Sequence, residues 1–204
     1  KNKGGKLYLR IEDTDKDRSK DEFKNQIIDS LKWIGINYED NEYIQSDKID
    51  HHINVANELL KKGLAYKCYC SPEELEEMRA QAKAEKRAPR YNGKWRNLSS
   101  SLAPSGVNPV IRIKCPQTGS TILKDLVQGE INIKNTELDD FIIMRSDGTP
   151  TYMLSVVVDD YDMEVSHVIR GVDHLTNTIR QQQIYNAMEW DIPIYSHIPC
   201  INGM

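Results

Sequence analysis

Apolar residues recur along the chain with two different periods. Residues 6–11 alternate apolar and polar positions, which predicts a β-strand. Residues 21–34 and 46–60 place apolar side chains three and four positions apart, which predicts two amphipathic helices. Gly35 and Gly63 follow these two stripes directly, and we expect them to end the helices.

Serine residues mark two of the predicted helix starts. Ser46 precedes the second stripe and is predicted to be its N-cap. Residues 71–74, Ser-Pro-Glu-Glu, combine an N-cap serine, a proline at the first helical position and a capping-box glutamate, so a mostly charged helix is predicted over 71–87. Another helix is predicted over 173–188, while residues 153–158 fit either a helix or a buried strand. Short strands are predicted at 65–70, 110–114, 131–134, 141–144, 165–169 and 198–201.

The order of these elements predicts a domain with an insertion. Helices and single strands alternate at both ends of the chain, and short strands fill its middle. This order is typical of an α/β domain that is interrupted by an α+β module. The predicted boundaries are 1–67 for the first part of the α/β domain, 68–150 for the inserted domain and 151–204 for the second part.

Composition narrows the class of protein. The 204 residues are 39% hydrophobic and 28% charged, and no run of 18 apolar residues occurs, so we expect no membrane span. The net charge of −4 gives no overall attraction to nucleic acid, which would have to meet a local patch. Four cysteines in a chain of this size favour reduced thiols and a cytoplasmic location. Because the chain lacks a starting Met and stops abruptly, we expect it to be a piece of a longer protein.

The first candidate site is the segment Arg-Ile-Glu-Asp-Thr-Asp at residues 10–15. Three carboxylates and a hydroxyl follow the first predicted strand, where ligands bind in open α/β sheets, and such a cluster suits a cationic group such as an α-ammonium. The alternative is that Asp13, Thr14 or Asp15 caps the following helix. That alternative does not explain Glu12, which precedes the capping position.

The second candidate site follows the predicted strand at 165–169. Arg170 comes at the carboxyl end of this strand, where a guanidinium can bind a carboxylate through two hydrogen bonds. Asp173 and His174 begin the next helix, whose free amides favour an anion. The alternative is a solvent-exposed arginine followed by an ordinary capping aspartate.

Common nucleotide and nucleophile motifs are missing. The sequence contains no G-x-G-x-x-G, so a dinucleotide-binding dehydrogenase is not expected, and residues 4–6, Gly-Gly-Lys, precede a strand where a phosphate loop would follow one. No segment matches a nucleophile elbow.

Several segments together resemble the catalytic domain of bacterial class I glutamyl-tRNA synthetases. The matching segments are 10–15, 119–121 with 124–125, 145–152 (Arg-Ser-Asp-Gly-x-Pro-Thr-Tyr) and 168–171 (Val-Ile-Arg-Gly). The resemblance covers essentially the whole chain. Glu12 and Asp15 favour the glutamate enzymes over the glutaminyl enzymes, which tend to have Asp and Asn at these places.

The resemblance implies a role for particular residues. For glutamate, it implies that Glu12 receives the α-ammonium, that Tyr152 positions the amino acid and that Arg170 pairs with the γ-carboxylate. It places the ATP pocket at Asp173, His174, Cys200 and Ile201, and it places Arg18 near the tRNA 3′ end. The resemblance implies a Rossmann-like class I synthetase fold that is interrupted by the inserted domain. The inserted domain would receive the tRNA acceptor stem.

The resemblance also implies an activity. The parent enzyme would activate L-glutamate with ATP and Mg²⁺ and transfer it to tRNA(Glu), as a monomer in the cytoplasm. The two ATP signatures of the family lie outside residues 1–204, so this fragment alone is expected to be inactive. The alternatives are a paralogue that glutamylates a modified base of tRNA(Asp) and a noncatalytic module that binds tRNA or an amino acid.

No zinc is expected. Some members of the family hold zinc through a Cys-x-Cys pair and a later Cys-x-His pair. Cys68 and Cys70 match the first pair, but Trp95 and Asn97 stand where the second pair would be. Two thiols do not complete the four-ligand set that structural zinc requires.

Overall fold

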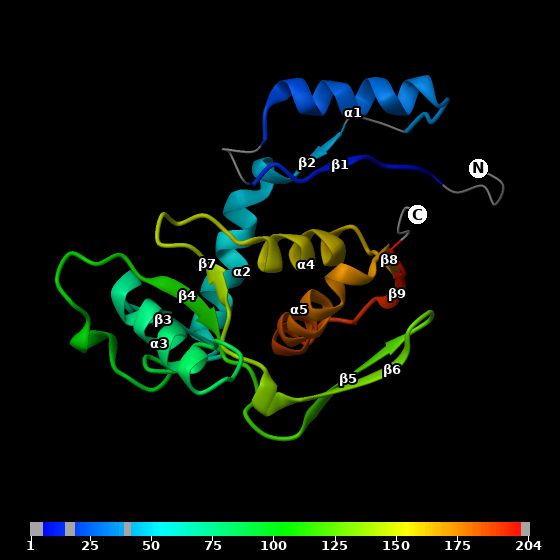
Figure 1. Cartoon of the computed structure of the whole chain (residues 1–204). Coiled ribbons are helices and arrows are strands. Elements are labelled where there is room, and N and C mark those ends of the chain that lie inside the picture. Colours follow the sequence, from blue (N-terminus) through cyan, green and yellow to red (C-terminus); the bar gives the residue numbers. More distant parts are fainter. Residues whose placement is uncertain (1–5, 15–18, 39–41, 201–204) are drawn as a thin grey trace. The chain divides into compact units, whose positions relative to one another are not determined.

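The computed structural model describes residues 6–14, 19–38 and 42–200, and the chain forms two compact units that divide between His51 and His52. The elements of the first unit are β1 (Arg10–Ile11), α1 (Asp21–Trp33), β2 (Tyr43–Ile44), the 3₁₀ turn η1 (Gln45–Lys48) and the start of α2 (Ile49–Lys61). The elements of the second unit are the rest of α2, β3 (Ala65–Cys68), α3 (Pro72–Ala84), η2 (Ser100–Leu102), β4 (Val110–Ile113), β5 (Ser120–Asp125), β6 (Gly129–Lys134), η3 (Asn135–Glu137), β7 (Ile142–Met144), α4 (Tyr152–Asp162), β8 (His167–Gly171), η4 (Val172–His174), α5 (Leu175–Met188) and β9 (Ile194–Ile198) (Figure 1).

The first strand is shorter than the sequence predicts. Only Arg10 and Ile11 pair, in parallel, with Tyr43 and Ile44 of β2. Because β2 offers two residues as partners, the described residues 6–9 have no strand to continue along and lie outside β1.

The helix α1 confirms the prediction for residues 21–34. Gly35 adopts a φ of +73°, and its N–H bonds to the carbonyl of Lys32, so it ends the helix as expected. The apolar stripe is not buried, however, since Phe23 and Ile27 are each 49% exposed. Within the described part of this unit, the other elements are the short strands β1 and β2, η1 and the start of α2, and they leave this stripe partly exposed.

The helices α2 and α3 also confirm their predictions in most respects. In α2 the buried residues His52, Val55, Ala56 and Leu59 follow the expected spacing. The capping box of α3 is formed in both directions, from Glu74 N–H to the Ser71 hydroxyl and from Ser71 N–H to the Glu74 carboxylate. This helix ends at Ala84, three residues before the predicted end.

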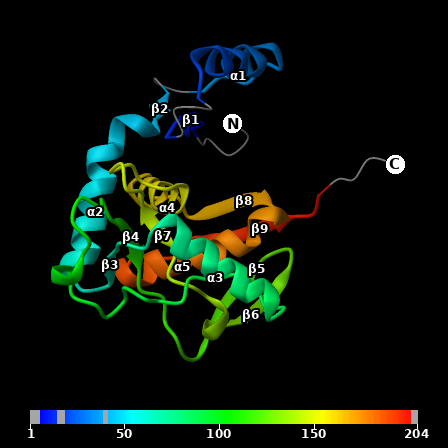
Figure 2. The ribbon, with the colours of Figure 1, turned by 60° about the vertical axis from the view of Figure 1, so that its left-hand side comes forward.

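Two sheets lie in the second unit. The first is antiparallel, with strand order β3-β4-β7, and the second is mixed, with strand order β6-β5-β9-β8 (Figure 2). In the mixed sheet β5 and β6 form a hairpin, and β8 and β9 are parallel strands joined through α5. The pairing of β5 with β9 joins the hairpin to this parallel pair at Asp125 and Tyr195.

Two predictions about these strands are wrong. No strand is predicted at β5, although alternate residues Thr121, Leu123 and Asp125 are the more buried ones there. The last strand covers residues 194–198 where the prediction is 198–201, because β9 pairs in register with β8 along its full length.

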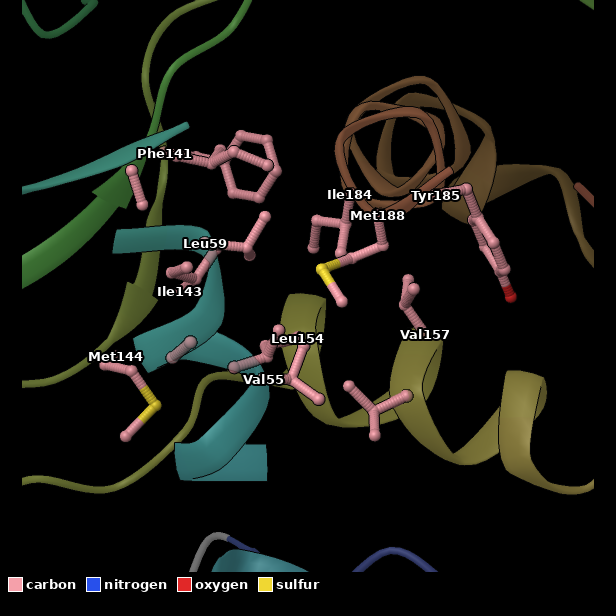
Figure 3. Packing of buried hydrophobic residues seen from close by; sticks show 14 of the residues in the cluster. Val55, Leu59, Phe141, Ile143, Met144, Leu154, Val157, Ile184, Tyr185 and Met188 are labelled. Carbon is pink, nitrogen blue, oxygen red and sulfur yellow. The ribbon is translucent and has the colours of Figure 1, made fainter. Parts of the chain in front are cut away.

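The main hydrophobic core resolves the ambiguity at residues 153–158. These residues lie in α4, and Leu154, Val157 and Val158 are spaced for one helical face that packs into the core. Figure 3 shows this face meeting Ile184 and Met188 of α5. The same core includes Leu59 of α2, Ile143 of β7 and Phe141, which directly precedes β7 (Figure 3).

These elements confirm a mixed α/β fold with parallel and mixed sheets. The core contains residues from α2, β3, β4, β7, α4 and α5, and so it draws on both sides of the predicted boundaries near 68 and 150. The inserted domain therefore stays a prediction. None of the helices in the described ranges is long and apolar enough to cross a membrane.

Candidate active site

Arg170 lies at the centre of a polar cluster in the second unit. It stands on β8 directly opposite His197 of β9 in the parallel register, and facing residues of neighbouring strands share one side of a sheet. The guanidinium donates to four neighbouring side chains. Its partners are His197 Nε2 at 3.3 Å, the Tyr152 hydroxyl at 3.3 Å, Thr178 Oγ1 at 2.5 Å and Gln181 Oε1 at 2.8 Å.

All four partners of Arg170 are uncharged acceptors or hydroxyls when His197 is neutral. No carboxylate among the described residues forms a salt bridge with Arg170, so its positive charge is not directly paired. The ring of Tyr195 faces the guanidinium at 5.6 Å, which adds a weak attraction to the cation. The alternative of a simply solvent-exposed arginine does not fit, because Arg170 is only partly exposed and is held from several sides.

The hydrogen bonds of Arg170 limit how it can bind a carboxylate. A guanidinium has five N–H donors. The Nε hydrogen and the Nη2 nitrogen are engaged by His197, Thr178 and Gln181, which leaves one Nη1 hydrogen beside the Tyr152 hydroxyl. The expected two-bond grip on a carboxylate therefore has one Nη1 hydrogen available to it in this arrangement, with the Tyr152 hydroxyl 3.3 Å from Nη1.

Sequence reasoning missed the residues behind Arg170. His197 is fully buried, and its Nδ1 lies 2.6 Å from Oδ2 of Asp125, which is 72 residues earlier in the chain. Burial raises the pKa of the Asp125 carboxyl, but hydrogen bonds from the Gln128 amide, the His197 ring and the Val127 amide outweigh burial and lower the pKa to about 2. No sequence pattern indicated that Asp125 faces inward, because the alternating burial of Thr121, Leu123 and Asp125 in β5 is seen only in the structure.

Tyr152 and His174 are neighbours in this cluster. Tyr152 begins α4, and its hydroxyl lies 3.4 Å from His174 Nδ1. Asp173 is different, since its side chain is 67% exposed and lies 3.6 Å from His174 Nε2. A Cβ at Gly171 would collide with the Asp173 carboxylate, so a larger residue there would require the exposed Asp173 side chain to move.

The first candidate site lies in the other unit. The Glu12 carboxylate accepts hydrogen bonds from the Arg10 guanidinium at 3.0 and 3.3 Å. Both residues line a cavity of about 460 Å³, together with residues of α1 and β2. A ligand ammonium at Glu12 would therefore share this carboxylate with Arg10.

The prediction that Ser46 caps a helix is wrong, and so is the capping of α1 by Asp13 or Thr14. The N-cap of α1 is Lys20, which makes no side-chain capping bond. The carboxylate of Asp13 instead accepts from the Ser46 amide at 2.8 Å and from the Ser46 hydroxyl at 2.7 Å, at the start of η1. The Ser46 hydroxyl therefore donates to Asp13 and does not cap α2. Asp13, which follows the carboxyl end of β1, accepts from the Ser46 amide at the start of η1.

Some of the predicted site residues lie outside the part of the chain that the structure describes. Arg18, Asp15 and Ile201 lie outside the described residues. Cys200 is described, and it is exposed beyond the end of β9.

The relatives of the chain establish its family. All 204 residues match the family described as tRNA synthetases class I (E and Q), catalytic domain. The chain belongs to this family. It is 58% identical over 202 residues to a protein of Pelagibacter ubique named glutamate–tRNA ligase, and 57% identical over 203 residues to glutamate–tRNA ligase 2 of Bartonella quintana. These matches cover 99% and 100% of the chain, and the chain spans 43% of each relative's length.

Solved structures of the family share the fold. A glutamate–tRNA ligase of Elizabethkingia meningosepticum, crystallised in complex with its amino acid, matches 97% of the chain with a TM-score of 0.86 and 32% identity. A glutamate–tRNA synthetase of Elizabethkingia anophelis matches 98% of the chain with the same TM-score and identity. The chain covers 43% and 44% of these two structures.

Two of the four cysteines of this synthetase chain contact the Tyr91 hydroxyl. The Tyr91 hydroxyl lies 3.4 Å from Cys68 Sγ and 3.9 Å from Cys70 Sγ, and it accepts a hydrogen bond from the Trp95 amide. Burial raises the pKa of the Cys70 thiol to about 11. No group of three or more His, Cys, Asp or Glu side chains in the described ranges is arranged to hold a metal ion. The absence of zinc stays a prediction.

Proposed function

We propose that this chain is the glutamate-recognising part of a glutamate–tRNA ligase. The observation that carries the proposal is Arg170, a partly buried guanidinium held by four side chains, with one further Nη1 hydrogen and the Tyr152 hydroxyl 3.3 Å from Nη1. A γ-carboxylate beside these two groups would form an ion pair with the guanidinium, whereas the neutral amide of glutamine would accept a hydrogen bond without the ion pair. The ligase names of the relatives support the choice of glutamate.

The remaining site residues complete the proposal. Glu12 would receive the α-ammonium of glutamate, Arg18 would lie near the tRNA 3′ end, and the predicted inserted domain at 68–150 would receive the acceptor stem. The ATP pocket would include Asp173, His174, Cys200 and Ile201. Mg²⁺ enters as the ion that accompanies ATP, and no residue of this chain is assigned to it.

The proposed reaction has two steps. The α-carboxylate of glutamate attacks the α-phosphate of ATP, which forms glutamyl-adenylate and releases pyrophosphate. A ribose hydroxyl of the terminal adenosine of tRNA(Glu) then attacks the acyl carbon and releases AMP. The described residues contribute by binding and orienting glutamate, and this positioning lowers the entropy cost of both steps. We propose that the ligase works as a monomer in the cytoplasm.

The test is ATP–pyrophosphate exchange by the ligase that contains this chain, in the presence of tRNA(Glu), with glutamate and glutamine compared. Sites that bind one substrate group by hydrogen bonds can reject an analogue by about 10⁴-fold or more, so exchange should require glutamate. Charging of tRNA(Glu) supports the proposal. Glutamylation of tRNA(Asp) alone would favour the paralogue that modifies an anticodon base, and glutamate binding without exchange would favour a noncatalytic module.

A further inference from the structure

His197 is held on both ring nitrogens. Nδ1 lies 2.6 Å from Asp125 Oδ2, and Nε2 lies 2.9 Å from Thr178 Oγ1 and 3.3 Å from Arg170 Nε. Both His197 and Asp125 have side chains that are fully buried. No water is needed to complete these contacts, because each ring nitrogen already has a protein partner.

The partners of His197 determine which nitrogen carries the proton. An arginine can only donate, so Nε2 must accept from Arg170, and an ionised carboxylate can only accept, so Nδ1 must donate to Asp125. A neutral ring with its proton on Nδ1 satisfies both contacts. The opposite tautomer would set two N–H groups against each other at Arg170 and leave two acceptors facing each other at Asp125.

The carboxylate of Asp125 is itself fixed by the backbone. Its oxygens accept from the amides of Val127 and Gln128 at 2.9 and 2.8 Å, and from the amide of His197 at 3.1 and 3.2 Å. The side chain of Gln128 returns to the His197 carbonyl at 2.8 Å. The turn between β5 and β6 thus holds β9 at the residue that faces Arg170.

This arrangement can orient the Arg170 guanidinium without neutralising its positive charge. A carboxylate in direct contact with Arg170 would orient it but would also compete with a substrate carboxylate. Asp125 instead acts through the imidazole of His197, so the guanidinium is oriented while its charge is left for a ligand.

We propose that Asp125 and His197 are positioning residues that hold Arg170 in its carboxylate-binding orientation by fixing the proton of His197 on Nδ1. The inference deepens the proposed function and rests on it for the identity of the ligand. It assigns to the β5–β6 hairpin, which lies in the predicted inserted domain, a part in amino-acid recognition.

The first measurement needs no variant. Long-range ¹⁵N–¹H correlation spectra of the ligase with ¹⁵N-labelled histidine report the tautomer of each ring, and a His197→Gln variant assigns the signal. We expect a neutral His197 with its proton on Nδ1. A proton on Nε2 would overturn the proposal whatever the substrate proves to be.

The second measurement uses Asp125→Asn, which keeps the shape of the side chain and can donate toward Nδ1. The His197 proton should then move to Nε2, and KM for glutamate should rise about 10- to 100-fold, by analogy with the loss found when groups that orient metal-ligating histidines are removed. KM for ATP should stay within about twofold, since Asp125 acts through Arg170. A changed tautomer with unchanged KM for glutamate would overturn the proposal.

A matched control separates positioning from stability. Asp140 is another buried aspartate of the second unit, bound by the Tyr66 hydroxyl, the Arg96 guanidinium and the Cys115 amide. Asp140→Asn should lower stability without changing KM for glutamate, and an equal rise of KM in both variants would overturn the positioning role. If Arg170→Met leaves glutamate recognition intact while His197 keeps its Nδ1 proton, the proposed function fails. The hydrogen-bonded arrangement of Asp125 and His197 is then still supported.

Discussion

His52 Nε2 of α2 lies 2.7 Å from Asp159 Oδ1 of α4, and both side chains are fully buried. The two residues are 107 positions apart in the chain. This bond joins two of the helices that form the main core, close to Val55 and Val158. Removing a hydrogen-bond partner from a buried polar group of this kind lowers the free energy of unfolding.

We predict that His52→Ala destabilises the protein by about 3 kcal/mol or more, because it leaves the Asp159 carboxylate without this partner and opens a cavity. The free energy of unfolding, measured by urea denaturation, checks this. His51→Ala is the matched control, since His51 is exposed, and it should change stability by no more than about 0.5 kcal/mol. Equal losses of stability in both variants would contradict a stabilising role for the bond between His52 and Asp159.

The capping box of α3 gives a second stability prediction. Ser71→Ala removes the acceptor for the Glu74 amide and should cost about 1 kcal/mol in free energy of unfolding. Ser30→Ala serves as the control, because the Ser30 hydroxyl in the last turn of α1 bonds its own helix at the Gln26 carbonyl. We expect the control to be neutral or slightly stabilising, and a loss at Ser30 as large as at Ser71 would argue against the cap.

The contact between Asp13 and Ser46 predicts that the Ser46 amide in the first unit is protected from hydrogen exchange. Asp13→Ala removes the acceptor of the Ser46 amide and should speed hydrogen exchange of that amide by about 10-fold, as expected for the loss of a helix cap. The exposed Asp29 of α1 is the control residue, and Asp29→Ala should leave exchange at Ser46 unchanged. Unchanged exchange in Asp13→Ala would show that the contact does not form.

The low pKa of Asp125 predicts a stability loss in acid. Because the folded pKa is lowered from 3.8 to about 2, the ionised carboxylate contributes stability above about pH 4. This contribution is lost as the pH falls through about 2. The difference in free energy of unfolding between the wild-type protein and Asp125→Asn should therefore be largest above about pH 4 and shrink toward pH 2. A difference that stays constant over this range would contradict the lowered pKa.

The parts of the fold that depend on neighbouring residues were predictable from the sequence. The capping box at Ser71 and the glycine stop at Gly35 are set by residues a few positions apart, so their signals are local. The role of Ser46 was not predictable in this way, because its partner Asp13 is 33 residues away.

The candidate site shows the same limit. Arg170 and Tyr152 stand in recognisable motifs, and the structure brings them together at 3.3 Å. The contribution of Asp125 arises only when β5 pairs with β9, and it depends on a contact across 72 residues. No spacing along the chain encodes that contact, and no strand was predicted at β5.

The most direct test of the account is the selectivity of an Arg170→Met ligase. Methionine is uncharged and cannot donate, so kcat/KM for glutamate should fall at least about 100-fold, while the low value for glutamine should stay nearly unchanged and the ratio of the two should collapse. Arg180→Met is the control, because Arg180 pairs with Asp139 and takes no part in the Arg170 cluster. The account predicts loss of glutamate selectivity in Arg170→Met alone. An unchanged glutamate-to-glutamine ratio in that variant would contradict it.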